Sequence, residues 1–383
     1  MVKNAKHPID WGLITIKEIC KSLNYGTSKK STFSGKCAVL RMGNLQNGYI
    51  DWTDLVYTND EKDIQKYSLV KGDVLFNRTN SADLVGKTSL YRGEYPAIYA
   101  GYLIRLNYDR KKVVGEYLNY ILNTQEAKEY CLAVKTDGVS QSNINAQKIG
   151  AFLFHLPPFE EQEKISEALS DVDNLIFSLQ KLIEKKKAIK QGTMQELLTG
   201  KKRLPGFSEE WAYRRVGEIC SITKGQIITE KTAIHGNVPV IAGGKTPAFY
   251  HNVANRESDV ITISASGANA GYIAYHDYPI FASDCSTIES SDQYDVKFIY
   301  YALLYHQQEL IGMQTGGAQP HIHPKEIGVL LVPRINQEEQ RAIANVLSDM
   351  DSEIEQLEKK LAKYQQIKQG MMQELLTGRI RLV

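Results

Sequence analysis

Two stretches of the chain repeat apolar residues at alternating spacings of four and three positions. The first comprises Ile165, Leu169, Val172, Ile176, Leu179 and Ile183, and the second Ile343, Leu347, Met350, Ile354, Leu357 and Leu361. This spacing predicts two long helices that pack through a coiled-coil seam. At a rise of 1.5 Å per residue, about 40 residues would form a helix roughly 60 Å long.

The two predicted helices are copies of each other. Met194–Gly200 reads MQELLTG and recurs 178 residues later as Met372–Gly378. The pair Glu161-Gln162 returns at the same offset as Glu339-Gln340. Two unrelated long helices could share a period, but they would not share polar identities. We therefore infer an internal repeat.

The stretch before the first helix predicts a compact α+β lobe. Its apolar runs are short and strand-like, and turn signals such as Gln46-Asn47-Gly48 separate them. The runs cover residues 38–41, 73–76, 89–91 and 101–106. Residues 115–122 instead have helical spacing.

The stretch between the two helices matches this lobe at its start and its end. Trp211, Val216, Glu218, Ile219 and Cys220 match Trp11, Ile16, Glu18, Ile19 and Cys20, and Gln319, His321, Ile322 and Ile327 match Gln141, Asn143, Ile144 and Ile149. The central sequences of the two stretches differ. This pattern predicts that both stretches share one fold but have different surfaces.

These patterns predict an α+β fold with a pseudo-twofold internal repeat. Its four segments are lobe 1 (residues 1–156), a first long helix (157–200), lobe 2 (201–333), and a second long helix with a tail (334–383). If each lobe has neighbouring termini, the helices run antiparallel between the lobes. The tail from Gly378 resembles the stretch from Gly200 that leads to Trp211, so we expect it to end near Trp11.

Three lysines interrupt the apolar seam. They are Lys186, Lys190 and Lys368. The last third of each helix is therefore expected to pack less regularly or to meet another partner.

Composition is that of an ordinary soluble protein, with 43% hydrophobic and 23% charged residues. No apolar run approaches the roughly 18–20 residues of a membrane span, and no apolar segment follows the basic N-terminal residues as in a signal peptide. Five widely spaced cysteines without a Cys-x-x-Cys motif fit the reducing cytoplasm, where we expect the protein to act.

Charge differs between the lobes. Residues 1–157 carry 21 Lys and Arg against 15 Asp and Glu, whereas residues 205–333 carry 8 against 13. The basic first lobe suits a polyanion, and the acidic second lobe does not obviously do so.

No catalytic motif survives inspection. Pro157-Pro158-Phe159 is similar to the Asn-Pro-Pro-Phe motif of amino-methyltransferases, but Leu156 replaces the asparagine. Gly86-Lys87-Thr88 resembles the end of a phosphate loop, but Ser81 stands where the first glycine is needed. His321 and His323 lack a third metal ligand nearby in sequence. We expect no catalytic residue and no metal site.

Polar loop residues of both lobes are candidates for DNA contact. Arg, Asn and Gln can pair with base edges, and Lys, Ser and Thr with phosphates. The candidates in lobe 1 are Lys29, Lys30, Arg41, Asn44, Asn77, Arg78, Thr79, Asn80, Lys87, Tyr91, Arg92, Gln141 and Asn143. Those in lobe 2 are Lys224, Lys245, Arg256, Ser264, Ser266, Asn269, Gln319 and His321.

The arrangement of two lobes, each followed by a long helix, resembles the specificity subunit of type I restriction-modification enzymes. The resemblance covers the whole chain and includes the Pro-Pro-Phe-Glu-Glu-Gln start at 157–162, its looser counterpart at 333–340, and both Gln-Glu-Leu-Leu-Thr-Gly helix ends. It implies a non-catalytic reader of double-stranded DNA. Each lobe would read half of a split site, and the helices would set the unread spacer.

The same resemblance implies partners and cofactors. Two modification subunits would dock on the helices and bring S-adenosylmethionine, and restriction subunits would join them with ATP and Mg²⁺. This chain would hold no cofactor itself.

Two other hypotheses remain open. One is a coiled-coil interaction protein whose duplicated lobes bind protein or carbohydrate, and the missing export signal and basic first lobe count against it. The other is a self-contained methyltransferase, which would have to bind S-adenosylmethionine alone.

Overall fold

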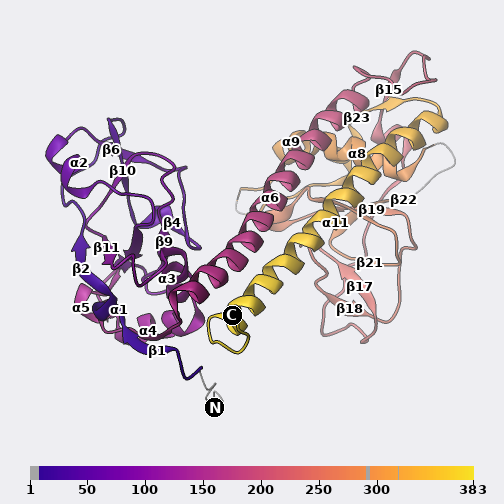
Figure 1. Cartoon of the computed structure of the whole chain (residues 1–383). Helices are drawn as coiled ribbons and strands as arrows, with labels where there is room; N and C mark the ends of the chain where they lie inside the picture. The colour runs from indigo at the N-terminus through magenta and orange to yellow at the C-terminus, as the bar shows by residue number, and fades with distance from the viewer. Residues whose placement is uncertain (1–7, 290–293, 318) are drawn as a thin grey trace. The chain divides into compact units, whose positions relative to one another are not determined.

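The computed structural model describes residues 8–289, 294–317 and 319–383. The chain forms two compact units. Unit 1 contains the residues up to Ser178 together with Leu361–Val383, and unit 2 contains Leu179–Lys360. Each unit thus joins one lobe to segments of both long helices, α6 (Phe159–Leu198) and α11 (Gln337–Leu375), which are drawn in Figure 1. The two long helices predicted from apolar spacing are present, whereas the division into four segments stays a prediction.

Lobe 1 is built on two sheets. The first is antiparallel with the strand order β2-β11-β7-β9, and the second has the order β10-β3-β6, in which β3 pairs parallel with β10 and antiparallel with β6. Their bounds are β2 (Cys20–Tyr25), β11 (Leu103–Tyr108), β7 (Val74–Asn77), β9 (Thr88–Leu90), β10 (Ala97–Tyr99), β3 (Cys37–Leu40) and β6 (Val56–Thr58). The predicted helix at 115–122 is α3 (Gly115–Leu122).

The other elements of lobe 1 are short. They are β1 (Gly12–Thr15), α1 (Ile16–Ile19), η1 (Met42–Asn44), β4 (Leu45–Gln46), β5 (Tyr49–Ile50), α2 (Glu61–Tyr67), β8 (Thr79–Asn80), α4 (Gln125–Val134), β12 (Thr136–Asp137), β13 (Ser142–Asn143), α5 (Ala146–Gly150) and β14 (Leu153–Leu156). Strand β1 pairs with β14, which brings the two ends of the lobe together.

Lobe 2 repeats the topology of lobe 1 despite its different sequence. Its antiparallel sheet has the order β16-β22-β19-β20, and in its second sheet β17 pairs antiparallel with β18 and parallel with β21. The bounds are β16 (Ile222–Lys224), β22 (Cys285–Glu289), β19 (Val260–Ser264), β20 (Ile273–His276), β17 (Val238–Ile241), β18 (Phe249–His251) and β21 (Phe281–Ala282). The remaining elements are β15 (Ala212–Arg215), α7 (Val216–Ile219), η2 (Gly267–Asn269), α8 (Val296–Tyr305), α9 (Gln307–Gly312), α10 (Pro324–Gly328) and β23 (Leu331–Arg334). The inferred repeat of one scaffold is confirmed.

All the predicted seam residues are buried or half-buried. Several of them also pack into the core of a lobe. The buried ones are Ile165, Leu169, Leu179, Ile183, Ile343, Leu347 and Ile354, and the half-buried ones are Val172, Ile176, Met350, Leu357 and Leu361. Ile165 and Leu169 belong to the core of lobe 1 together with Leu375 of α11, and Ile343 and Leu347 belong to the core of lobe 2. The start of each helix is therefore part of a lobe core.

A buried glutamate anchors the start of α6. Glu161 is 3% exposed. Its carboxylate accepts a hydrogen bond from Trp11 Nε1 (3.0 Å) and forms an ion pair with Arg381 Nε (2.5 Å). The Arg381 guanidinium also pairs with Asp10 (2.8 Å). The tail therefore ends near Trp11, as predicted.

The same anchor recurs at the start of α11. Glu339 is 1% exposed and binds Arg203 Nε (2.7 Å) and Trp211 Nε1 (3.4 Å). In each unit the anchor joins three parts of the chain. They are the start of one long helix, the stretch just after the other, and the tryptophan that opens the lobe.

A buried glutamine beside each glutamate ties the helix to its lobe. Gln162 Oε1 accepts from the N–H of Val114, the residue that precedes α3, at 2.9 Å. Gln340 Oε1 accepts from the N–H of Asp295, the residue that precedes α8, at 2.8 Å. Both carboxamides also donate to backbone carbonyls, so the buried polar groups are paired. The repeated Glu-Gln is thus a buried polar motif.

Ion pairs within each unit show that the two helix segments run antiparallel. In unit 1, Asp173 of α6 pairs with Lys368 of α11 at 2.6 Å, while Glu161, earlier in α6, pairs with Arg381, later in the chain. In unit 2, Lys190 pairs with Asp351 at 2.5 Å, and Lys186 pairs with Glu353 at 2.6 Å. The three lysines that interrupt the seam are therefore ion-paired between the helices, and the expectation of less regular packing there stays a prediction.

The glycine that closes each repeated heptapeptide ends its helix. Gly200 and Gly378 have φ values of +69° and +70°, the left-handed conformation that glycine adopts without a Cβ penalty. A Cβ on Gly378 would lie 2.4 Å from Pro8 Cδ, and one on Gly200 would lie 3.1 Å from Trp211 Cε3. Both glycines are needed for backbone conformation and for close approach.

The anchor predicts a large stability loss for Glu161→Ala. Removing this buried carboxylate takes away the hydrogen bond from Trp11 Nε1 and the ion pair with Arg381, so we expect the free energy of unfolding to fall by about 2 kcal/mol. Urea unfolding at constant m-value measures this loss. Glu355→Ala is the control, because the Glu355–Lys359 pair is exposed and should contribute almost nothing. An equal loss of unfolding free energy in the two variants would contradict the anchoring role of Glu161.

The helix ends predict that Gly378→Ala destabilises more than Gly206→Ala. Both glycines have positive φ, which costs alanine about 1–2 kcal/mol, but nothing lies within 4 Å of a Cβ on Gly206. At Gly378 the overlap with Pro8 adds to that cost. Urea midpoints of the two variants test this, and a smaller loss for Gly378→Ala would refute it.

Candidate nucleic-acid interface

In lobe 1 the fold brings together two stretches that lie far apart in the sequence. Strand β8, in the connection after β7, pairs with β13, so that Thr79 faces Asn143. The Asn143 carboxamide donates to Thr79 Oγ1 at 2.8 Å, and the N–H of Ile144 donates to the Arg78 carbonyl at 2.8 Å. The candidates at 77–80 and at 141–143 therefore form one composite surface, which we call surface 1.

In lobe 2 the equivalent stretches meet in the same way. Ser266 forms a β-bridge with His321, and the N–H of Ile322 donates to the Ala265 carbonyl at 2.9 Å. The N–H of Gly267 donates to the Pro320 carbonyl at 3.0 Å. Candidates after β19 and before α10 thus form a second composite surface, called surface 2.

Arg78 is held at surface 1 by aromatic and backbone contacts. Its guanidinium carbon lies 4.8 Å from the ring centre of Tyr25, and one terminal nitrogen donates to the Gly101 carbonyl at 3.3 Å. Its Nε is buried without a hydrogen-bond partner. These contacts hold the side chain in place and leave donor capacity on its terminal nitrogens.

Lys87 and Arg92 cluster around the hairpin β4–β5. Lys87 Nζ donates to Gln46 Oε1 at 2.8 Å, and the Arg92 guanidinium lies 4.2 Å from the ring centre of Tyr49. Tyr91 is buried and donates to the Tyr95 carbonyl. The backbone of Lys87 meets surface 1, because the N–H of Asn77 donates to the Lys87 carbonyl at 2.8 Å.

The basic candidates early in lobe 1 are paired with acidic neighbours. Lys29 contacts Asp60 (2.5 Å) and Asp63 (3.1 Å), and Arg41 contacts Asp54 (2.8 Å). Lys30 is exposed. These pairs reduce the positive charge that Lys29 and Arg41 offer to a polyanion.

In lobe 2, Lys245 is exposed, and its Nζ lies 5.6 Å from the ring centre of Tyr272. Lys224 is also exposed. Arg256 instead pairs with Glu289 at 3.0 Å and donates to Thr287 and Thr223, so it ties sheet strands together.

Five candidates have buried side chains. They are Asn44, Asn77, Thr79, Tyr91 and Ser264. Asn44 bonds the Asp51 and Asp54 carbonyls, which is a loop-holding role. Their contact with DNA stays a prediction, and burial favours the role of supporting the loops. The accessible polar candidates at the surfaces are Gln141 and Gln319, with Asn80, Asn143, Ser266, Asn269 and His321 half-buried.

Sequence reasoning missed three residues at these surfaces. Tyr25 and Tyr102 are exposed. The Tyr25 ring lies beside the Arg78 guanidinium, and the N–H of Arg78 donates to the Tyr102 carbonyl. Asp284 accepts a hydrogen bond from Ser266 in lobe 2. A carboxylate can accept from cytosine N4, and tyrosines can lie against bases or sugars. No sequence signal distinguished them, because each comes from a different strand or loop.

Burial makes the cysteines poor nucleophiles. Desolvation raises the pKa of Cys20 and Cys285 to about 12 and that of Cys131 and Cys220 to about 11, and it also raises the pKa of Cys37. All five thiols therefore stay protonated at neutral pH.

Within residues 8–289, 294–317 and 319–383, no group of three or more His, Cys, Asp or Glu side chains could hold a metal ion. No helix within the same ranges is both long and apolar enough to cross a membrane.

Solved structures share this fold. The crystal structure of a type I restriction-modification S subunit from Mycoplasma genitalium superposes with a TM-score of 0.71, with 98% of each chain covered and 20% sequence identity. A structure from work on assembly and conformational transition of the type I restriction-modification system gives a TM-score of 0.58 at 18% identity, covering 98% of this chain and all of the other. At these identities the similarity shows the fold alone.

Curated relatives match along nearly the whole chain. A putative type I restriction enzyme MjaX specificity subunit from Methanocaldococcus jannaschii is 28% identical, covering 98% of this chain and 95% of the relative. The MjaVIII specificity subunit of the same organism is 24% identical, covering 98% and 94%.

The model of the type I restriction modification DNA specificity domain matches twice, at residues 8–191 and 208–369. Each match contains one lobe and most of the long helix that follows it. Together the two matches span most of the chain, so this protein belongs to the type I restriction-modification DNA specificity family.

Proposed function

We propose that this chain is the non-catalytic subunit that selects DNA for a type I restriction-modification complex. Lobe 1 reads one half of a split site and lobe 2 reads the other. The observation that carries this proposal is the pair of surfaces 1 and 2. One topology places two loops together at the same position in both lobes, and the side chains differ between them.

Different surfaces on one scaffold suit a DNA site whose halves differ. Surface 1 offers Arg78, Asn80 and Asn143, the residue types that pair with purine edges. Surface 2 offers Gln319, Asn269 and the Asp284 carboxylate, with Lys245 elsewhere in the same lobe. The acidic balance of lobe 2 means that phosphate contacts from partner subunits supply part of the affinity.

The duplicated helices support a complex with two copies of a modification subunit. Equivalent residues recur 178 positions apart on α6 and α11, so each helix offers the same docking surface. Those subunits would bring S-adenosylmethionine, and restriction subunits would bring ATP and Mg²⁺. This chain holds no cofactor itself, and its buried, protonated thiols fit a role without nucleophilic chemistry. We place it in the cytoplasm, where free thiols persist.

The proposal predicts selection of one bipartite sequence. The purified chain, combined with its modification subunit, is incubated with a randomised duplex library, and bound DNA is sequenced. Two conserved half-sites with a fixed unread spacer are expected. A single contiguous motif or no motif would contradict the two-lobe mechanism, and binding of S-adenosylmethionine by this chain alone would favour a self-contained methyltransferase.

Two variants test a base contact in lobe 1 and a phosphate contact in lobe 2. Arg78→Ala should relax recognition of one half-site by about 1–3 kcal/mol of discrimination and leave the other intact. Lys245→Ala should weaken binding across sequences and reduce the slope of log affinity against log salt by about 1, as loss of a phosphate contact does. Equal loss at both half-sites for Arg78→Ala would indicate global destabilisation instead.

A further inference from the structure

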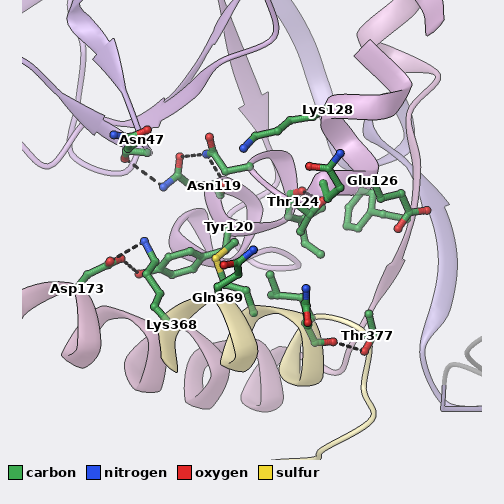
Figure 2. A pocket seen from close by; sticks show the side chains of 18 of the residues that line it. Asn47, Asn119, Tyr120, Thr124, Glu126, Lys128, Asp173, Lys368, Gln369 and Thr377 are labelled. Atoms are coloured by element: carbon green, nitrogen blue, oxygen red, sulfur yellow. Dashed lines mark hydrogen bonds and ion pairs between the residues drawn. The ribbon is translucent and has the colours of Figure 1, made fainter. Parts of the chain in front are cut away.

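One carboxylate on each long helix joins three elements at a single point. In unit 1, Asp173 of α6 accepts a hydrogen bond from Tyr120 Oη of α3 at 2.7 Å and pairs with Lys368 Nζ of α11 at 2.6 Å. Figure 2 shows Tyr120 and Lys368 converging on Asp173. We call these three residues triad 1.

Unit 2 contains the same arrangement with the helices exchanged. Asp351 of α11 accepts from Tyr301 Oη of α8 at 2.8 Å and pairs with Lys190 Nζ of α6 at 2.5 Å. Each lysine also lies near the tyrosine ring of its own triad, at 5.7 Å for Lys368 and 5.4 Å for Lys190. We call Tyr301, Asp351 and Lys190 triad 2.

The triads are placed to fix the orientation of each lobe on its helices. The Glu161 anchor, Gln162 and the nearby apolar contacts hold lobe 1 at the start of α6, and attachments confined to that end would leave the lobe free to tilt. Asp173 lies twelve residues further along, roughly 18 Å at the rise of an α-helix, and gives the lobe a second polar attachment. Two attachments at that separation resist rotation of the lobe about the first.

A cavity lies beside each triad. A cavity of about 480 Å³ in unit 1 is lined by Asn119, Tyr120, Asp173, Lys368 and Met372, among others. A cavity of about 290 Å³ in unit 2 is lined by Lys190, Leu304 and Asp351. Beside each cavity the triad forms a polar link between α3 or α8 and the two long-helix segments.

The two triads differ in burial. The Asp173 side chain is 5% exposed, and Tyr49 of β5 also lies beside it, whereas the Asp351 side chain is 41% exposed. Burial raises the pKa of Tyr120 and Tyr301, so both phenols keep their proton and donate at neutral pH. The buried triad should therefore contribute more to positioning than the exposed one.

We propose that the triads are positioning elements that determine how strictly the chain holds the spacer between its two half-sites. The inference rests on the proposed function of the lobes. Adding one base pair to the spacer moves a half-site by about 3.4 Å and turns it by roughly a tenth of a helical turn. A lobe that pivots at its anchor can follow this change, and a lobe fixed at two points cannot.

The test compares spacer tolerance in the assembled complex of this chain with its modification subunits. The probes are duplexes that carry the half-sites selected by the wild type, with spacers of the preferred length and one base pair longer or shorter. For Asp173→Asn, binding to the altered spacers relative to the preferred one should rise roughly tenfold, the effect of losing a hydrogen bond to a charged group. Asp351→Asn should give a smaller rise.

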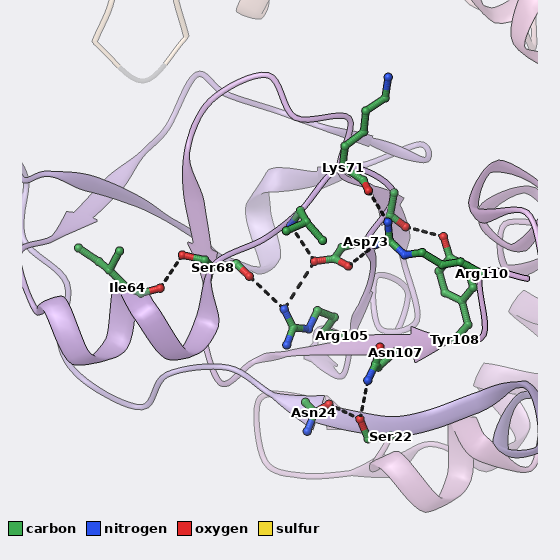
Figure 3. A network of polar contacts seen from close by, with 12 residues as sticks. Ser22, Asn24, Ile64, Ser68, Lys71, Asp73, Arg105, Asn107, Tyr108 and Arg110 are labelled. Carbon is green, nitrogen blue, oxygen red and sulfur yellow. Dashed lines mark hydrogen bonds and ion pairs between the residues drawn. The ribbon is translucent and has the colours of Figure 1, made fainter.

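Two further variants separate positioning from folding. Tyr120→Phe and Tyr301→Phe keep the rings and remove the hydroxyls that bond Asp173 and Asp351, so they decide the outcome if Asp173→Asn does not fold. Tyr120→Phe also removes the 3.2 Å contact between Tyr120 Oη and Ser170 Oγ of the same long helix. Asp73→Asn is the matched control, because Asp73 is also buried and pairs with Arg110 (2.8 Å) and Arg105 (3.6 Å), but entirely inside lobe 1 (Figure 3). It should weaken half-site binding without changing spacer preference.

The outcomes distinguish failure of the proposed function from failure of the proposed role of the triads. If the wild type selects no bipartite site, the proposed function fails and this inference fails with it. If the wild type selects a bipartite site and every triad variant discriminates against altered spacers as strongly as the wild type does, only this inference is overturned. Spacer relaxation by Asp73→Asn equal to that by Asp173→Asn would also overturn it, because general loosening of the lobe would then explain both.

Discussion

A buried carboxylate at the start of each long helix is the interaction on which the rest of each unit depends. Glu161 and Glu339 are almost inaccessible to water, and each is neutralised by an arginine that follows the other helix. A buried charge without a partner would be strongly destabilising. Each carboxylate can therefore be buried only when the start of one long helix meets the stretch that follows the other, which links every lobe to both helices.

The glutamine next to each glutamate adds neutral hydrogen bonds between the long helix and the lobe. Gln162 and Gln340 bond the backbone N–H that precedes α3 and α8, so the helix of the lobe core and the long helix share one network. Apolar packing of Ile165 and Leu169 beside Trp11 then adds a non-directional contribution. Polar pairing sets the position of the elements, and the apolar contacts stabilise them there.

The two lobes combine a constant framework with variable surfaces. Strand order and pairing are the same in both, although the sequences of their middles have diverged. The connection after β7 or β19 meets the segment before α5 or α10 in each lobe. Because that contact is made by short backbone bridges, the side chains it displays can change while the fold is kept.

The sequence alone determined the repeat, the two long helices and the helix at 115–122, because apolar periodicity and repeated polar residues are local properties of the chain. It also placed the tail near Trp11, since the order of segments restricts where the ends can lie. It did not show that Asn77 and Thr79 are buried, that Arg256 is paired with Glu289, or that Tyr25 lies beside Arg78. Those facts depend on which strands pair, and strand pairing joins residues whose separation in sequence carries no pattern. Only the tertiary structure decided that the lysines interrupting the seam are ion-paired, because their partners lie on the other helix.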